Sequence, residues 1–314
     1  MTRTLASRIG QAALVLLLAF TASFLLLQAL PGDAILIKYQ NPEMGLTPDQ
    51  IAEIRVRYGA DAPIWAQYSN TLVNFLQGSF GYSIQAGVPV NTLLAANLPP
   101  TLRLASLGLL LAVVIAVVLA FAATLAPFAW LRNLLGSLPA LMISVPVFWL
   151  GIMLIQVFSF RLRLVPIINP SELQALILPV LTLALPIAAP LAQILIRSLD
   201  AVQTQPFVGV ARAKGASRFW VLSRHVLRNA LLPVLTVAGV LFGELLAGAV
   251  VTETVFGING LGRITEQAVS NQDTAVLQAI VILAALGFVL INLAVDLVAP
   301  LIDPRLNRAI GATV

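Results

Sequence analysis

The length, composition and charge of the chain place it among membrane proteins. Of its 314 residues, 59% are apolar and 10% are charged, and the small excess of 18 Lys and Arg over 13 Asp and Glu is ordinary for membrane proteins, so it does not indicate nucleic-acid binding. The chain has no cysteine and only one histidine, which excludes disulfides and thiolate metal sites and leaves few soft metal ligands.

Six apolar segments are each long enough to cross a membrane as a helix, which needs about 20 apolar residues. Helices are expected because lipid cannot satisfy free backbone groups and the segments show no two-residue alternation. The first segment is longer than the core of a signal peptide and no small-x-small cleavage site clearly ends it, so we expect it to be retained. The six predicted spans are residues 9–30, 101–126, 134–159, 174–197, 231–252 and 275–299.

The positions of Lys and Arg predict that both termini are cytoplasmic. With the N-terminus inside, most of these residues fall in cytoplasmic segments, although Arg161 and Arg163 lie outside. The expected division is a cytoplasmic N-terminus with the first span, an external helical insertion, a five-helix core with a cytoplasmic loop at residues 198–231, and a cytoplasmic tail. These parts cover residues 1–30, 31–99, 100–305 and 306–314 respectively.

The insertion at residues 31–99 is predicted to form a small helical subdomain. Residues 47–50 (Thr-Pro-Asp-Gln) combine a capping side chain, a proline for the first turn and a glutamine that can close a capping box. Apolar spacings of three and four then predict two helices, one with a face of Ile51, Ile54 and Tyr58 and an end at Gly59, the other starting at Pro63 with a face of Ile64, Tyr68, Leu72 and Phe75. The subdomain either helps to receive a delivered ligand or only packs on the spans.

Prolines mark the beginning and the interior of several predicted spans. Pro99 and Pro100 are expected to open the second span, because proline suits the first turn of a helix. Proline inside a span removes a helical hydrogen bond and permits a kink, which occurs in moving helices and in static bundles alike. Five prolines occur within the third and fourth spans: Pro139, Pro146, Pro179, Pro186 and Pro190.

The segment from Asp200 to Leu232 interrupts the apolar runs with five basic residues and one acidic residue. Pro206 suits a first helical turn, and Gly215 provides a left-handed stop for the helix that begins there. Ser217 can cap a second helix that runs from Arg218 toward Leu232. A basic helix–glycine–helix between spans is expected on the cytoplasmic side, where a cytoplasmic partner would bind.

The sequence of this loop resembles the coupling motif of ABC importer permeases; it reads A-R-A-K-G-A-S-R-F-W-V-L-S-R-H-V-L-R-N-A-L-L-P. It is most similar to the peptide/nickel branch, in particular to the B-type subunits of dipeptide and oligopeptide permeases. Gly215 matches the motif glycine and Ala211 its last alanine, whereas Gly209 takes the usual Glu position and residues 225–228 replace Ile-x-Leu-Pro. Residues 78–83, 302–305 and the loop 253–263, with Asn259 in place of proline, extend the resemblance over nearly the whole chain.

The resemblance implies an all-α membrane protein with six transmembrane helices of the type I ABC importer permease kind. It implies a bacterial inner-membrane subunit that forms half of a pathway for short peptides, with both termini cytoplasmic. The implied partners are a second homologous permease subunit, two cytoplasmic ATPase subunits, an external substrate-binding protein and the lipid bilayer, but not nucleic acid. The residues implied to contact the ATPase are Pro206, Ala211, Arg212, Ala213, Lys214, Gly215, Ser217, Arg224, His225, Arg228 and Asn229.

The chain is not expected to be an enzyme or to bind a cofactor itself. It lacks a Gly-x-x-x-x-Gly-Lys phosphate loop, so ATP and Mg²⁺ would be held by the partner ATPase subunits. The lone His225 lies in the basic loop, where a contact on the helix surface is a better interpretation than a catalytic base. A self-sufficient channel or an ion-coupled carrier is a weaker alternative, because carriers usually show inverted repeats and several buried charges.

Two acidic residues are candidates for the translocation pathway. Glu244 falls near the middle of the fifth span, where a carboxylate is costly unless it faces protein or water, so it either lines the pathway or binds an internal hydroxyl or backbone group. Glu253 belongs to the loop motif that follows the same span. The cargo stays open between short peptides and nickel or a metal chelate, although a bare metal ion would want ligands that this chain largely lacks.

Overall fold

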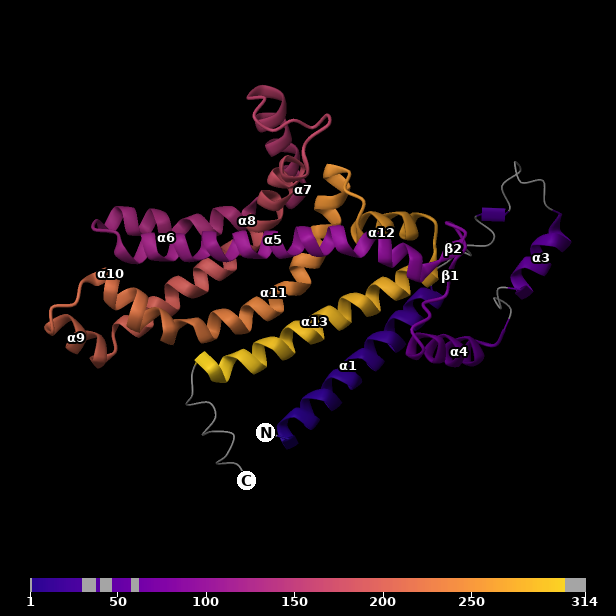
Figure 1. Ribbon diagram of the computed structural model, residues 1–314, viewed down its shortest axis with the longest axis horizontal. Helices are drawn as coiled ribbons and strands as arrows, with labels where there is room; N and C mark the ends of the chain where they lie inside the picture. The colour runs from indigo at the N-terminus through magenta and orange to yellow at the C-terminus, as the bar shows by residue number, and fades with distance from the viewer. Residues whose placement is uncertain (1, 30–37, 40–46, 58–61, 303–314) are drawn as a thin grey trace. The chain divides into compact units, whose positions relative to one another are not determined.

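The computed structural model describes residues 2–29, 38–39, 47–57 and 62–302, and these residues are mostly helical (Figure 1). The chain separates into two compact units, and both are made from two separate stretches of sequence. Unit 1 comprises Met1–Thr101 and Gly257–Val289, and unit 2 comprises Leu102–Phe256 and Leu290–Val314. Unit 1 therefore contains the predicted insertion together with the segment that follows the fifth span.

Unit 1 contains helices from both ends of the chain and a short antiparallel hairpin in which Ser83 pairs with Val88. Two of its helices, α5 and α13, continue into unit 2. Its elements in chain order are α1 (Thr2–Ala29), α3 (Pro48–Arg57), α4 (Ile64–Leu76), β1 (Tyr82–Ser83), β2 (Val88–Pro89), the start of α5 (Val90–Leu125), α12 (Leu261–Ser270) and most of α13 (Thr274–Ile302).

The predicted helices of the insertion form with the expected caps. Thr47 and Gln50 make the capping box of α3: the Thr47 N–H donates to Gln50 Oε1 at 2.8 Å, and the Gln50 N–H donates to Thr47 Oγ1 at 3.4 Å. Ile51 is buried, which confirms part of the predicted face of α3, whereas Tyr58 and Gly59 lie outside the described residues. Helix α4 has no buried residue: Tyr68, Leu72 and Phe75 of the predicted face are half-buried, and Ile64 is 60% exposed.

Buried polar residues hold the hairpin of unit 1 to α13. Asp273 is 2% exposed, and its carboxylate accepts hydrogen bonds from the Ser83 hydroxyl and from the backbone N–H of Val276 in the first turn of α13. The Thr101 hydroxyl in α5 similarly accepts from the N–H of Leu261 at 2.8 Å, at the start of α12. These bonds connect segments that are far apart in the sequence.

In the residues that the structure describes, the regular secondary structure of unit 2 is entirely helical. Its elements in chain order are the rest of α5, α6 (Ala129–Ser144), α7 (Val147–Leu154), the π-helical segment η2 (Ile155–Arg161), α8 (Glu172–Gln203), α9 (Pro206–Ala213), α10 (Arg218–Val221), the π-helical segment η3 (Leu222–Val226), α11 (Leu227–Phe256) and the end of α13.

The centre of unit 2 is α8, against which α6, α7 and α11 pack (Figure 1). Its buried side chains include a row at intervals of four residues, which forms one continuous helix face: Leu183, Ile187, Leu191, Leu195 and Leu199. Leu183 packs between glycines on two neighbours: a Cβ at Gly108 of α5 would lie 2.9 Å from Leu183 Cδ2, and one at Gly248 of α11 would lie 3.0 Å from Leu183 Cδ1. Glycine at both positions allows the helices to approach this closely.

Within the described part of the chain, five helices are long and apolar enough to cross a membrane alone, and α6 with α7–η2 makes a sixth span if this bent pair counts as one. The third predicted span, residues 134–159, thus corresponds to two helices that meet at 99°. The break has a local cause. Pro146 lacks an N–H and disfavours helical geometry for Val145, which is extended at φ −91° and ψ 119°.

The expected opening of the second span at Pro99 and Pro100 also differs from the structure. Helix α5 begins at Val90 and continues through both prolines to Leu125. The Asn97 amide donates to the Leu93 carbonyl at 2.8 Å, and the Thr101 hydroxyl donates to the Asn97 carbonyl at 3.3 Å, so side chains add bonds to the helix on both sides of the prolines. Likewise, α8 contains three prolines without a break.

Candidate coupling site

The first helix of the basic loop, α9, begins and ends as its sequence predicts. Pro206 occupies the first turn after the cap residue Gln205. The chain leaves the helix through Gly215 at φ +86°, a left-handed conformation that costs a residue with a side chain about 1–2 kcal/mol. The Gly215 N–H donates to the Arg212 carbonyl at 2.9 Å and the Ala216 N–H to the Ala211 carbonyl at 3.3 Å. This pair of bonds is the Schellman motif that ends many helices.

The second helix begins at the predicted cap. The Ser217 hydroxyl accepts the Trp220 N–H at 3.2 Å, and α10 continues without a break through η3 into α11. The wider π-helical turn in η3 was not predicted. It brings the His225 ring to 4.9 Å from the Trp220 ring, edge to face, and the Asn229 amide donates to the His225 carbonyl at 2.7 Å. His225 thus makes a contact on the helix surface, which is the interpretation that the sequence favoured over a catalytic base.

A small apolar core attaches the loop to the long helices of unit 2. Val208 of α9 is 1% exposed and packs in one cluster with side chains of α5, α8, α10, η3 and α11. Burying one such side chain stabilises the packed state by about 1.5–3 kcal/mol. The buried members of the cluster are Ala120, Leu195, Leu199, Val208, Val221, Leu222, Val226 and Ala230. These anchors were not predicted from the sequence, although the apolar side chains within a basic loop were a signal of them.

The opposite surface of the loop exposes basic and apolar side chains together. The basic residues Arg212, Lys214, Arg218, Arg224 and Arg228 are all exposed. Val210 is 56% exposed, and two aromatic residues, Phe219 and Trp220, are also exposed. The Arg212 guanidinium donates to Gln203 Oε1 at 3.2 Å, which directs it toward the end of α8. Such a surface suits a groove that is partly apolar and carries acidic side chains.

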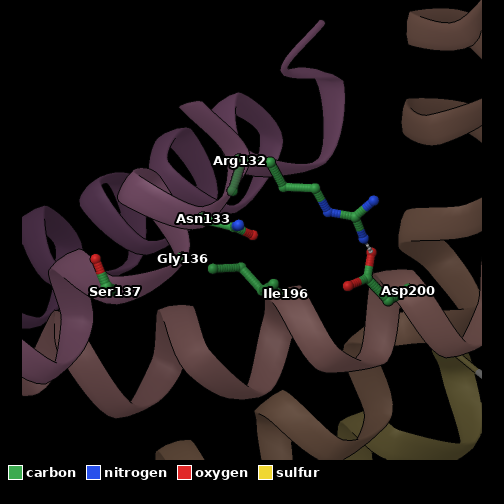
Figure 2. Close-up of a pocket in the computed structure, with 7 residues that line it drawn as sticks. Arg132, Asn133, Gly136, Ser137, Ile196 and Asp200 are labelled. Atoms are coloured by element: carbon green, nitrogen blue, oxygen red, sulfur yellow. Dashed lines mark hydrogen bonds and ion pairs between the residues drawn. The ribbon is translucent and has the colours of Figure 1, made fainter. Parts of the chain in front are cut away.

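An open pocket of about 380 Å³ lies beside the end of α8 and is lined by residues of α5, α6 and α8 (Figure 2). The Arg132 guanidinium of α6 donates to Asp200 Oδ1 of α8 at 2.9 Å across it. Asp200, the acidic residue of the basic segment, is therefore engaged by a different helix rather than by the basic residues that follow it. The pocket is lined by Ala123, Arg132, Asn133, Gly136, Ser137, Ile196 and Asp200.

The two pathway candidates lie on opposite sides of α11. Glu244 is exposed, whereas its neighbours Leu241 and Leu245 are buried, so the Glu244 side chain points away from the packed face. Glu253 is completely buried. The structure therefore does not bring the two carboxylates together. An exposed carboxylate in the middle of a span requires water, cargo or another subunit beside it in the membrane.

These features define the class of protein: a membrane protein of several spans with an exposed basic loop anchored in its helical bundle. Residues 108–308 match a family model described as "Binding-protein-dependent transport system inner membrane component", and residues 1–105 match the N-terminal model for membrane components of the same systems. The chain belongs to this family of transport permeases, as its motifs predicted. It is a membrane subunit of a binding-protein-dependent ABC importer.

Similar chains of about the same length occur in several bacteria. A probable peptide ABC transporter permease of Sinorhizobium fredii is 36% identical over 292 residues, covering 90% of this chain and 92% of that one. The glutathione transport system permease of Salmonella typhimurium is 37% identical, covering 93% and 94%. A putative peptide transport system permease of Brucella abortus is 36% identical and covers 98% and 99%.

Solved structures share the fold at low sequence identity. Two crystal forms of the MetNI methionine ABC transporter, solved in inward-facing conformations, match with TM-scores of 0.52 and 0.51 at 19% and 22% identity. Each match covers 67% of this chain and 96% of the other. The predicted fold class, a helical permease of the type I ABC importer kind, is confirmed.

Proposed function

We propose that the chain forms half of the translocation pathway for short peptides in an ATP-driven importer. A second homologous permease subunit would supply the other half, and an external binding protein would deliver the cargo. Two cytoplasmic ATPase subunits would bind ATP and Mg²⁺. The observation that carries this proposal is the α9–Gly215–α10 loop, which has an exposed basic and apolar surface on one side and a buried anchor on the other.

The anchored loop supports a simple mechanism of coupling. An ATPase subunit that binds the exposed surface of α9 would displace the helix when the ATPase pair closes. Because Val208 is buried among side chains of α5, α8 and α11, such a displacement would move the ends of these helices. Interiors pack too densely to absorb the motion locally, so it would reach the membrane spans. The chain itself needs no catalytic group for this work.

Peptides are the cargo that the relatives favour. Two of the similar chains described above are named for peptide transport and one for glutathione, which is itself a short peptide. A nickel or metal-chelate cargo is less well supported. The single histidine lies in the basic loop, where it contacts Trp220 instead of facing a pathway. If the cargo is a peptide, Glu244 would line the pathway and meet cationic groups of that peptide.

The proposed location is the bacterial inner membrane, with both termini and the basic loop in the cytoplasm. The supporting observation is the positive charge of the loop, because Lys and Arg near span ends favour the cytoplasmic side. The predicted insertion at residues 31–99 would then be external, where a binding protein approaches.

The function is tested with the complete complex in lipid vesicles, supplied with its binding protein and with ATP. We expect ATP-dependent, saturable uptake of a labelled tripeptide such as glutathione, and competition by unlabelled peptides. A complex whose ATPase subunits cannot hydrolyse ATP is the control. Uptake of a nickel–histidine chelate that peptides do not reduce would contradict the proposed cargo, and uptake without ATP would contradict the importer mechanism.

A further inference from the structure

The open pocket beside the end of α8 lies at the level of one membrane surface. No residue between Arg103 and Arg132 is charged, and the part of α5 that follows Arg103 is about 33 Å long, close to the ~30 Å of hydrocarbon in a bilayer. In α8, residues 173–196 are likewise uncharged. The ion pair of Arg103 with Glu172 therefore marks one edge of the hydrocarbon, and the ion pair of Arg132 with Asp200 marks the other. The pocket lies at this second edge.

Two exposed aromatic residues occur at the same edge. Phe128 directly precedes α6 and Trp130 lies in its first turn, two positions before Arg132. Their rings stack with centroids 6.5 Å apart, and Trp130 is 65% exposed. Tryptophan is enriched where membranes meet water, because its ring is apolar and its N–H is polar. These side chains indicate a membrane surface at this level independently of the charged residues.

The walls of the pocket change in polarity with depth. Arg132, Asn133 and Asp200 lie toward the ends of their helices (Figure 2). Gly136 and Ile196 lie about one helical turn further into the bundle. No atom is within 4 Å of a Cβ placed at Gly136, so this inner part of the pocket is open. A phospholipid has the same order of groups, with a polar headgroup at the surface and apolar chains below it.

The polar end of the pocket carries one group of each charge. Arg132 and Asp200 are the charged residues among those that line it, and their side chains remain 53% and 38% exposed. Their hydrogen bond joins one guanidinium nitrogen to one carboxylate oxygen, so other donors and an acceptor stay available. The Asn133 amide makes no hydrogen bond within the described part of the chain, whereas the Ser137 hydroxyl donates to the Leu134 carbonyl of its own helix. The pocket thus offers donors to an anion beside an acceptor for a cation.

We propose that this pocket binds the headgroup of a zwitterionic aminophospholipid such as phosphatidylethanolamine. The phosphate accepts hydrogen bonds from Arg132 and Asn133, and the primary ammonium donates to Asp200. Hydrogen bonds between charged groups are stronger than those between neutral ones. The inference goes beyond the importer function, and its failure would leave that function as it stands.

The same groups explain why this headgroup is preferred. Choline has no N–H to donate to Asp200, and an anionic headgroup such as that of phosphatidylglycerol brings no cation to it. A soluble zwitterion shares the chemistry of the ethanolamine headgroup. Lipid is favoured over it because the pocket lies where headgroups are concentrated and because its inner end is apolar. Pockets between membrane helices at this level are known to hold lipid headgroups.

Photocrosslinking of the complete complex in vesicles tests the proposal. The probe is a phosphatidylethanolamine with a diazirine near the glycerol end of one acyl chain, and the attached peptides are identified by mass spectrometry. We expect attachment to peptides from the start of α6 and the end of α8. Unlabelled phosphatidylethanolamine should compete for these positions about fivefold better than phosphatidylcholine or phosphatidylglycerol with the same chains.

Two substitutions test the roles of the charged groups. Asp200→Asn keeps an oxygen for Arg132 but removes the charge that the ammonium meets, and Arg132→Gln removes the guanidinium. Each should lower the attachment severalfold and remove the preference for ethanolamine. Glu172→Gln is the matched control, because it breaks the exposed ion pair at the other end of α8 and should change neither. The competition series uses the unaltered chain, so it tests the proposal even if a variant assembles poorly.

Three results would overturn the proposal. Equal competition by the three lipids would mean that the helices contact lipid without selecting a headgroup. Stronger competition by soluble glycerophosphoethanolamine or by a tripeptide than by phosphatidylethanolamine would assign the pocket to a soluble zwitterion. Attachment that appears only after the ATPase subunits are removed would mean that an ATPase subunit covers the pocket in the complex.

Discussion

Two regions of this chain, the α9–Gly215–α10 loop in unit 2 and the hairpin of unit 1, are both built on short elements and a left-handed glycine, yet they are held differently. The loop is attached by apolar side chains such as Val208 and leaves its basic and aromatic residues exposed. The hairpin is fixed by the buried carboxylate of Asp273, which binds Ser83. Apolar contacts let a segment shift as a body, whereas a buried charged hydrogen bond requires one geometry. The loop is thus suited to be moved by a partner, and the hairpin to stay in place.

The largest difference is expected in the side of the membrane: the loop should lie on one side, and the insertion at residues 31–99, which contains the hairpin, on the other. A cysteine at Gln50, in α3 of the insertion, should react with a membrane-impermeant thiol reagent added to intact cells, and one at Ser217 in the loop should not. The chain without cysteine is the control for background labelling. Labelling at 217 but not at 50 would show that the proposed orientation is inverted.

Gly215→Val should have the next largest effect, because a β-branched side chain at φ +86° is strongly disfavoured and would distort the end of α9. Nothing lies within 4 Å of a Cβ placed there, so the cost is in the backbone and the protein should still insert and pair. We expect peptide uptake and peptide-stimulated ATP hydrolysis in vesicles to fall about tenfold or more.

Gly209→Ala is the matched control for that experiment, since Gly209 lies within α9, is exposed, and has free space around a Cβ. It should retain near-normal uptake. If Gly215→Val also retained normal uptake and ATP hydrolysis, the loop would not be the point of transmission.

The sequence predicted the features of these regions that depend on neighbouring residues. Thr47, Ser217, Pro206 and Gly215 act on backbone groups within a few positions, so their roles as helix caps, first turn and stop could be identified without the fold. The bond between Ser83 and Asp273 joins residues 190 positions apart, and no local pattern encodes it. The break at Pro146 shows the limit in another way, because Pro179, Pro186 and Pro190 interrupt no helix, so a proline in the sequence does not by itself predict where the chain bends.

Asp273→Ala should destabilise unit 1 selectively, by about 2–3 kcal/mol, because it removes a charged hydrogen-bond acceptor and leaves the buried Ser83 hydroxyl without it. Reporter cysteines at the fully buried Ala279 in unit 1 and Ala188 in unit 2 make this measurable with a thiol-reactive dye during heating. The reporter at 279 should become reactive at a temperature about 5–10 °C lower.

The reporter at 188 should change less than the reporter at 279. Asp49→Ala, at an exposed carboxylate in α3, is the control substitution and should shift neither. An equal shift at 279 and 188 after Asp273→Ala would mean that the two units unfold together, which would contradict a local role for this bond.

Val208→Ala tests the apolar attachment of the loop. Truncating this buried side chain should cost about 1–2 kcal/mol of packing and loosen α9 from the ends of α5, α8 and α11. We expect a severalfold lower ratio of peptide uptake to ATP hydrolysis, with normal amounts of assembled complex. Val210→Ala, at a position that is 56% exposed in the same helix, is the matched control. It should weaken binding of the ATPase without changing that ratio. If both variants changed only the binding, the buried cluster would not transmit motion.

Glu244→Gln should have the smallest effect, and its effect should depend on the charge of the cargo. The side chain points away from the packed face of α11, so the substitution should leave folding and membrane level unchanged. If the carboxylate faces the pathway, its loss should slow the uptake of cationic peptides by a few fold and affect anionic peptides such as glutathione less, because only the former lose a favourable charge interaction. Glu244→Asp, which keeps the charge, should restore most of the uptake of cationic peptides. Equal rates for cationic and anionic peptides in both variants would assign Glu244 to a contact with another subunit, and the pathway would then have to be lined by other residues of the spans.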